Sequence, residues 1–200
     1  RVEPKVRYLE EMGFSLVLFS LQDSLSAVPF LRSARFLLLY RLPFNVIVKQ
    51  LIAGAREAGL EIFYDIDDLI FEKDAFSSSA MMKSVSSGER REHLRAAEHY
   101  FQALKLCDFG IASTAQIAVA LEKHLKKGVF LLENGILPTL LKASELPRPP
   151  RASKMVWIGY GSGSKTHDAD FRVCSSALLR VLEKYSNTGL VIHGELELDP

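Results

Sequence analysis

The sequence has no excess of charge of either sign and few cysteines. Its 25 basic and 24 acidic residues give a net charge of +1, so no electrostatic feature favours nucleic acid or an anionic membrane surface as a partner. The two cysteines, Cys107 and Cys174, are far apart in the chain and match no metal-ligand spacing. Two distant cysteines are typical of a reduced compartment. We therefore expect a cytoplasmic protein with no nucleic-acid partner.

Long hydrophobic runs are also lacking. No stretch approaches the roughly 18 apolar residues that a membrane-spanning helix requires, and the longest apolar runs have the length of a strand. The composition, 48% hydrophobic and 24% charged, is that of an ordinary globular protein. The chain opens inside a predicted helix over 4–12 that Gly13 closes, and it stops just after a predicted strand. We expect that both ends are cut from a longer protein.

Apolar segments of strand length alternate with helical segments along the chain. The apolar residues of each strand segment are consecutive, which is typical of a parallel sheet buried on both faces. Further helices are predicted over 45–58, 89–106, 114–127 and 168–184. This alternation predicts an α/β fold with a doubly wound parallel sheet. The predicted strands cover residues 15–20, 35–40, 60–64, 109–112, 128–132, 155–159 and 189–193.

Two segments interrupt this alternation. Residues 76–88 are rich in serine and methionine and are predicted to form a loop. Residues 145–151 contain three prolines, which can continue neither a helix nor a central strand. We therefore predict a first domain over 1–144, a proline-rich linker over 145–153 and the beginning of a second domain over 154–200.

The sharpest local signal is a glycine-rich segment between a strand and a helix. Gly159, Gly161 and Gly163 lead into the predicted helix N-terminus, with Lys165 close by. Glycines let backbone amides approach an anion, and the helix start and the lysine add positive charge, so the segment suits a diphosphate. Its spacing matches neither a dinucleotide fingerprint nor a P-loop, and a plain tight turn is the alternative. His167 either binds phosphate or sugar or caps the helix.

Three carboxylates, Asp65, Asp67 and Asp68, follow the strand over 60–64. They lie at its carboxyl end, where open α/β sheets bind their ligands. Three interpretations are open. The carboxylates could include a nucleophile of the haloacid-dehalogenase type, they could form the metal-binding Asp-x-Asp pair of a glycosyltransferase architecture other than GT-B, or they could serve in helix capping and loop hydrogen bonds. The first lacks its usual context, which is an early position in the domain and a later Gly-Asp pair.

Two further strand ends carry polar residues. Arg41 directly follows the strand over 35–40, where it either binds an anion or is solvated. Asn134 and Gly135 follow the strand over 128–132, and an Asn-Gly pair in that position favours a turn.

Taken together, these segments resemble the group 1 (family four) retaining glycosyltransferases, which have the GT-B architecture of two facing Rossmann-like domains. Leu39-Tyr40-Arg41-Leu42-Pro43 is similar to the "YRxP" of one branch, and Tyr64-Asp65-Ile66-Asp67-Asp68-Leu69 to its "YDIDDL". Ser113-Thr114 opens a helix after a strand, as in the family. Glu133-Asn134-Gly135 resembles the Pro-Asn-Gly that ends the first domain, and residues 158–171 are similar to the opening of the second domain.

The resemblance implies a Rossmann-like, doubly wound first domain followed by the β-α-β start of a second one. It implies transfer of a sugar from a nucleotide-sugar donor to a glycan or lipid acceptor, without a metal or cofactor, and it allows peripheral membrane contact. Donor-side residues would be Asn134, Gly135, Gly161, Ser162, Gly163, Lys165 and His167; acceptor-side residues would be Arg41, Ser113 and Thr114; catalytic residues would be Asp65, Asp67 and Asp68.

The sequence departs from the family pattern in three places. Many members have a histidine after the strand that here ends at Tyr64, where this sequence has Asp65, Asp67 and Asp68. Tyr160 stands where the family commonly has an arginine that holds the donor diphosphate, and Leu137 stands where many members have an aspartate. The departures at Tyr160 and Leu137 keep an alternative open: a non-catalytic, glycosyltransferase-like scaffold domain of a larger protein.

Overall fold

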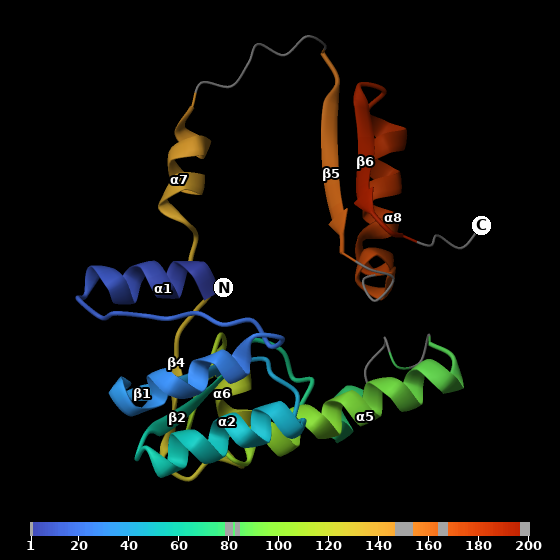
Figure 1. Cartoon of the computed structure of the whole chain (residues 1–200). Helices are drawn as coiled ribbons and strands as arrows, with labels where there is room; N and C mark the ends of the chain where they lie inside the picture. The colour runs from blue at the N-terminus through green and yellow to red at the C-terminus, as the bar shows by residue number, and fades with distance from the viewer. Residues whose placement is uncertain (1, 79–81, 83–84, 147–153, 164–167, 197–200) are drawn as a thin grey trace. The chain divides into compact units, whose positions relative to one another are not determined.

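The computed structural model describes residues 2–78, 82, 85–146, 154–163 and 168–196. Its contacts divide the chain into two compact units (Figure 1). The first unit comprises Arg1–Ser78 and Ser86–Glu145, and the second contains the described residues from 154 onward. Each unit is built on its own parallel sheet.

The first unit contains a four-stranded parallel sheet in the order β1-β2-β3-β4. Because parallel neighbours need a crossover connection, a helix lies between each pair of consecutive strands. The predicted α/β fold is confirmed. The strands are β1 (Phe36–Tyr40), β2 (Glu61–Ile66), β3 (Phe109–Ala112) and β4 (Gly128–Leu131), and the main crossover helices are α2 (Val46–Glu57), α5 (Ser87–Leu104) and α6 (Ala115–Glu122).

The crossover helices share one face of this sheet, because consecutive right-handed crossovers between adjacent strands place their helices on the same side. The strand side chains on that face, among them Leu39, Ile62 and Tyr64, are buried in the main hydrophobic cluster together with the apolar stripes of these helices. At the start of each of the three helices, a side chain accepts a hydrogen bond from an amide of the first turn, which would otherwise be unpaired. These capping residues are Asn45, Ser86 and Thr114.

The opposite face of the sheet carries a row of phenylalanine rings. Phe63 lies between Phe36, at a centroid distance of 5.7 Å, and Phe109, at 4.9 Å; Phe130 lies 5.8 Å from Phe109. α1 (Val2–Glu11) lies on this side of the sheet (Figure 1). The sheet therefore has helices on both faces, consistent with a doubly wound, Rossmann-like fold.

The second unit is a strand-helix-strand arrangement. β5 (Val156–Ser162) and β6 (Thr188–Gly194) are parallel, and α8 (Asp168–Lys184) connects them. Phe171 of α8 is buried, and its ring lies 4.8 Å from that of Tyr160. The predicted strand-helix-strand order is confirmed, and β5 is longer than expected at its carboxyl end.

Several predicted elements differ from the structure. Residues 15–20 form no strand: the backbone has no sheet partner there, and Val17 and Leu18 are exposed. The helix predicted over 114–127 ends at Glu122, and turns lead from there to Gly128, whose φ is +135°. Helical segments that were not predicted include, among the described residues, η1 (Ser24–Ser33), α3 (Lys73–Ser78) and α7 (Pro138–Glu145).

Two further predictions concern the connecting segments. Of the loop expected over 76–88, the first residues belong to α3 and the last two to α5. Most of the proline-rich linker lies outside the described residues. Within the described part of the chain, no helix has both the length and the hydrophobicity that crossing a bilayer requires.

Candidate functional site

The carboxyl ends of β1, β2 and β3 lie side by side and bring three of the polar segments together. Tyr40 and Asp65 are register partners, and the Arg41 amide donates to the Asp65 carbonyl oxygen at 3.0 Å. Arg41 has a φ of +46°, in the left-handed region. This conformation is disfavoured for a side chain with a Cβ and is found most often where function requires it. The chain thus leaves the sheet abruptly after β1.

The guanidinium of Arg41 contacts two of the three carboxylates. Its Nη1 lies 3.2 Å from Oδ1 of Asp67 and 3.0 Å from Oδ2 of Asp68, and the Tyr40 hydroxyl donates to Asp67 at 3.4 Å. Burial alone would lower the pKa of Arg41, but the two carboxylates outweigh it and raise this pKa. Arg41 is therefore a permanent cation. Asp68 remains 57% exposed, so the cluster is open to solvent on that side.

Asp65 faces a different cation. Its carboxylate is 1% exposed and accepts a hydrogen bond from Nζ of Lys5, on α1. The three carboxylates that are close in sequence are therefore divided between Lys5 on one side and Arg41 on the other. Among the described residues, no group of three or more histidine, cysteine or acidic side chains is arranged to hold a metal ion.

The end of β3 contacts the same cluster through a hydrogen bond. The Ser113 hydroxyl donates to the main-chain oxygen of Asp67 at 3.3 Å, and Thr114 caps α6 by accepting from the Ile117 amide at 3.3 Å. Arg41, Ser113 and Asp67, predicted separately from three strand ends, thus meet at one edge of the sheet. The carboxyl ends of parallel strands are the edge at which α/β proteins bind ligands.

The segment after β4 lies near α1: a Cβ added at Gly135 would lie 3.7 Å from Pro4. Asn134 and Gly135 are exposed, and residues 132–137 have no regular structure before α7 begins. The tight turn predicted at Asn134-Gly135 is therefore wrong. Glu133 and Gly135 line a pocket together with residues of α1.

In the second unit, the glycine-rich segment begins within β5. Gly161 and Ser162 are the last residues of the strand, and Gly163 follows it. The Ser162 side chain is buried and donates to the main-chain oxygen of Glu195. A Cβ added at Gly161 would meet no atom within 4 Å, so the space over this backbone is open. Lys165 and His167 lie outside the described residues.

Two features near this segment were not predicted. His193 is the register partner of Gly161 and is exposed at the carboxyl end of β6. In the sequence, only its position at the end of a predicted strand indicated it as a site residue. Asp168 and Asp170 lie in the first turn of α8, where acidic side chains stabilise the helix dipole.

The two parallel sheets and the polar strand ends define the class of this protein as Rossmann-like α/β. No family model matches the sequence, and no curated protein matches it. Among solved structures, the chain is similar to Staphylococcus aureus MnaA in a co-structure with UDP, with a TM-score of 0.35 and 10% sequence identity. The similarity covers 92% of this chain and 48% of that chain, so this chain spans about half the length of that protein.

Proposed function

We propose that this chain is part of a nucleotide-sugar-dependent glycosyltransferase that transfers a sugar to a glycan or lipid acceptor. The observation that carries this proposal is a contact between three segments, each of which resembles the family on its own. Arg41 comes from the first of them, Asp67 and Asp68 from the second and Ser113 from the third. Arg41 contacts both carboxylates, at 3.2 and 3.0 Å, and Ser113 contacts the main-chain oxygen of Asp67 at 3.3 Å. Segments distant in sequence that converge on one edge support a shared site.

On the acceptor side, the proposal assigns the binding of hydroxyl groups to the cluster around Arg41. The exposed oxygens of Asp68 and the half-buried Asp67 can accept hydrogen bonds from sugar hydroxyls, and Arg41 can donate to them. Arg41 also holds both carboxylates in fixed positions, and fixed polar groups bind at a lower entropic cost.

On the donor side, the proposal assigns the diphosphate to Gly161, Ser162, Gly163 and Lys165, and it assigns donor binding to His167 as well. Backbone amides and a lysine ammonium would stabilise the negative charge that develops on the departing nucleoside diphosphate. The open space over Gly161 supports this role, because a phosphate must approach the backbone closely. By the same resemblance, the proposal also assigns donor binding to Asn134 and Gly135.

One observation favours a second candidate, a non-catalytic scaffold that keeps the glycosyltransferase-like fold. Tyr160 stands at the position of a family arginine, and its ring packs edge-on against Phe171 at 4.8 Å. The side chain at this position thus contributes packing to the second unit and supplies no cation.

Lys165→Ala in the intact protein that contains this chain tests the proposal. Loss of the cation should slow sugar transfer by about 100-fold, the usual effect of removing one group that stabilises a developing charge. Lys154→Ala is the matched control, because Lys154 is exposed just before β5, and it should leave the rate unchanged. Equal rates for both variants would contradict the role of Lys165, and an intact protein without transfer activity would favour the scaffold.

A further inference from the structure

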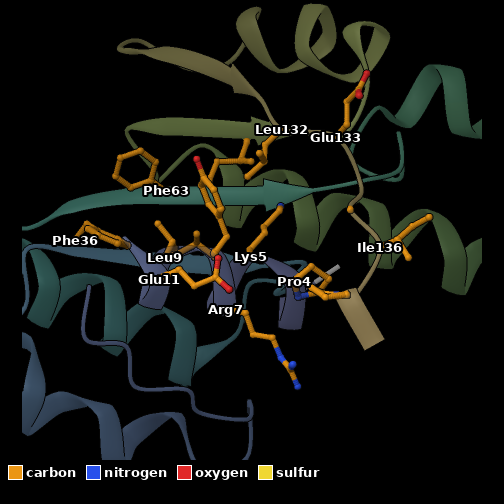
Figure 2. Close-up of a pocket in the computed structure, with 15 residues that line it drawn as sticks. Pro4, Lys5, Arg7, Leu9, Glu11, Phe36, Phe63, Leu132, Glu133 and Ile136 are labelled. Carbon is orange, nitrogen blue, oxygen red and sulfur yellow. The ribbon is translucent and has the colours of Figure 1, made fainter. Parts of the chain in front are cut away.

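A pocket of about 500 Å³ lies between α1 and the phenylalanine-bearing face of the first sheet (Figure 2). This volume lies within the range of small-molecule sites. α1 contributes Pro4, Tyr8 and Leu9 to the lining, but none of its residues is fully buried. The helix therefore covers the sheet face without filling the space beneath it. The pocket lies outside the cluster around Arg41.

The pocket is elongated, as the register of the sheet shows. Phe36 and Leu38 line it from β1, and Leu38 is the register partner of Phe63 on β2. On β3 the lining residue is Ile111, which pairs with Asp65, two residues beyond Phe63. After β4 the lining continues with Leu132. From β2 to β3 and on to the segment after β4, the lining positions thus shift toward the carboxyl ends of the strands, and the pocket runs diagonally across this part of the sheet.

The lining contributed by the strands is aliphatic and aromatic. Of the cationic side chains at the pocket, Lys5 is engaged by Asp65, and Arg7 lies 2.8 Å from Glu3 and points away from the sheet (Figure 2). Glu11 and Glu133 are the acidic residues of the lining, and both cations are engaged by carboxylates. An anionic ligand would therefore lose its hydration in this pocket without a cation to replace it, whereas a hydrocarbon gains free energy by leaving water.

We infer that the pocket beneath α1 binds a single hydrocarbon chain, of the kind that fatty alcohols and single-chain lipids carry. The elongated, apolar lining fits a linear chain better than a compact ring system. Binding of a chain here requires neither a nucleotide sugar nor the residues around Arg41, and of the residues proposed for the donor, Gly135 also lines this pocket.

Displacement of the uncharged methyl ester of a fluorescent anthroyloxy fatty acid by linear 1-alkanols tests the inference on the 200-residue chain. In a pocket, the affinity of the alkanols should rise about fourfold with each added methylene, the equivalent of burying one such group. The affinity should then level off once the pocket is full. An affinity that rises without limit would indicate partition onto an open surface and would overturn the inference.

Two neighbouring leucines provide a matched pair of variants. Leu132 lines the pocket and Leu131 does not, although both are largely exposed, at 41% and 53%. Leu132→Trp should fill part of the pocket and weaken probe binding at least about tenfold, and Leu131→Trp should leave it within about twofold. Ile136→Trp, also at an exposed lining residue, provides a second blocking variant if Leu132→Trp fails to fold.

The remaining outcomes are equally informative. Equal losses in Leu131→Trp and Leu132→Trp would overturn the inference, as would displacement by naphthalene at the concentrations at which dodecanol acts. A dimer in sedimentation velocity that excludes the probe would also overturn it, because a second copy would then cover this face. Displacement by dodecanol supports it, and displacement by a lysophospholipid of the same chain length would extend it to lipids with a head group.

Discussion

The guanidinium of Arg41 lies 3.2 Å from the carboxylate of Asp67, and this contact joins the ends of two adjacent parallel strands. The same nitrogen lies 3.0 Å from Asp68. Arg41 adopts its left-handed φ of +46° at the point where it makes both contacts. Because this conformation is unfavourable for arginine, the residue combines a local backbone cost with a favourable electrostatic position. Such a combination is typical of functional sites.

Comparison of Arg41→Gly with Arg41→Ala separates the backbone cost from the charge. Both variants lose the ion pairs, but glycine adopts a positive φ without steric cost. We therefore expect the glycine variant to be more stable than the alanine variant by about 1 kcal/mol, measured by urea unfolding. In the intact protein both variants should lose sugar transfer to the same extent. Equal stabilities would contradict the backbone argument, and retained transfer would contradict the role of the cation.

The Lys5–Asp65 pair predicts a strong coupling between α1 and the sheet. Lys5→Met leaves the carboxylate of Asp65, which is 1% exposed, without this cation, and the loss of one partner of a buried pair costs about 3 kcal/mol or more. The double variant Lys5→Met/Asp65→Leu should recover most of that stability, because no buried charge is left.

The control for this cycle lies on the same helix. Arg7 is 49% exposed and pairs with Glu3 one helical turn away, so Arg7→Met should change the free energy of unfolding by less than about 0.5 kcal/mol. If Lys5→Met and Arg7→Met have the same small effect in urea unfolding, Asp65 does not depend on Lys5.

Asp108 predicts a specific dependence of stability on pH. Burial alone would raise the pKa of Asp108, but hydrogen bonds from Arg56, at 2.6 Å, and from the Ile62 amide, at 2.9 Å, outweigh it and hold this pKa below its ordinary value. A lowered pKa in the folded state stabilises the protein above the unfolded pKa of about 3.9, and this contribution disappears as the pH falls further.

Asp108→Asn removes the titrating group at this position. The variant should be less stable than the wild type at pH 7, and its stability should fall less steeply between about pH 4 and pH 2. Urea midpoints of the two proteins over this range provide the comparison. Parallel curves would show that Asp108 makes no contribution to acid unfolding.

The sequence predicted those elements whose signals are local. The strand over 109–112 and the helix over 168–184 have the predicted bounds, because the spacing of their apolar residues is a local signal. The strand expected over 15–20 does not form, since an apolar run becomes a strand only beside a partner, which no local pattern reveals. The placement of Arg41, Asp67 and Ser113 at one edge follows from the rule that parallel strands share their carboxyl edge.

Other contacts depend on tertiary packing and could not be predicted. Lys5 reaches Asp65 across 60 positions of sequence, and only the position of α1 on the sheet makes this contact possible. The glycine-rich composition around Gly161 and Ser162 predicts a loop, yet these residues belong to β5 and pair with His193 and Gly194 of β6. The pairing with β6 therefore outweighs the low strand propensity of glycine.

The most direct measurement for the central claim is a thermal-shift screen of UDP-, GDP- and ADP-sugars on this chain and on the intact protein that contains it. A donor at 100 times its dissociation constant should stabilise the protein that binds it by about 2.7 kcal/mol, which corresponds to a rise of a few degrees in Tm. The account predicts that the sugars of one nucleotide class raise the Tm of the intact protein and that Lys165→Ala abolishes this rise. A Tm that no nucleotide sugar changes would contradict the glycosyltransferase function.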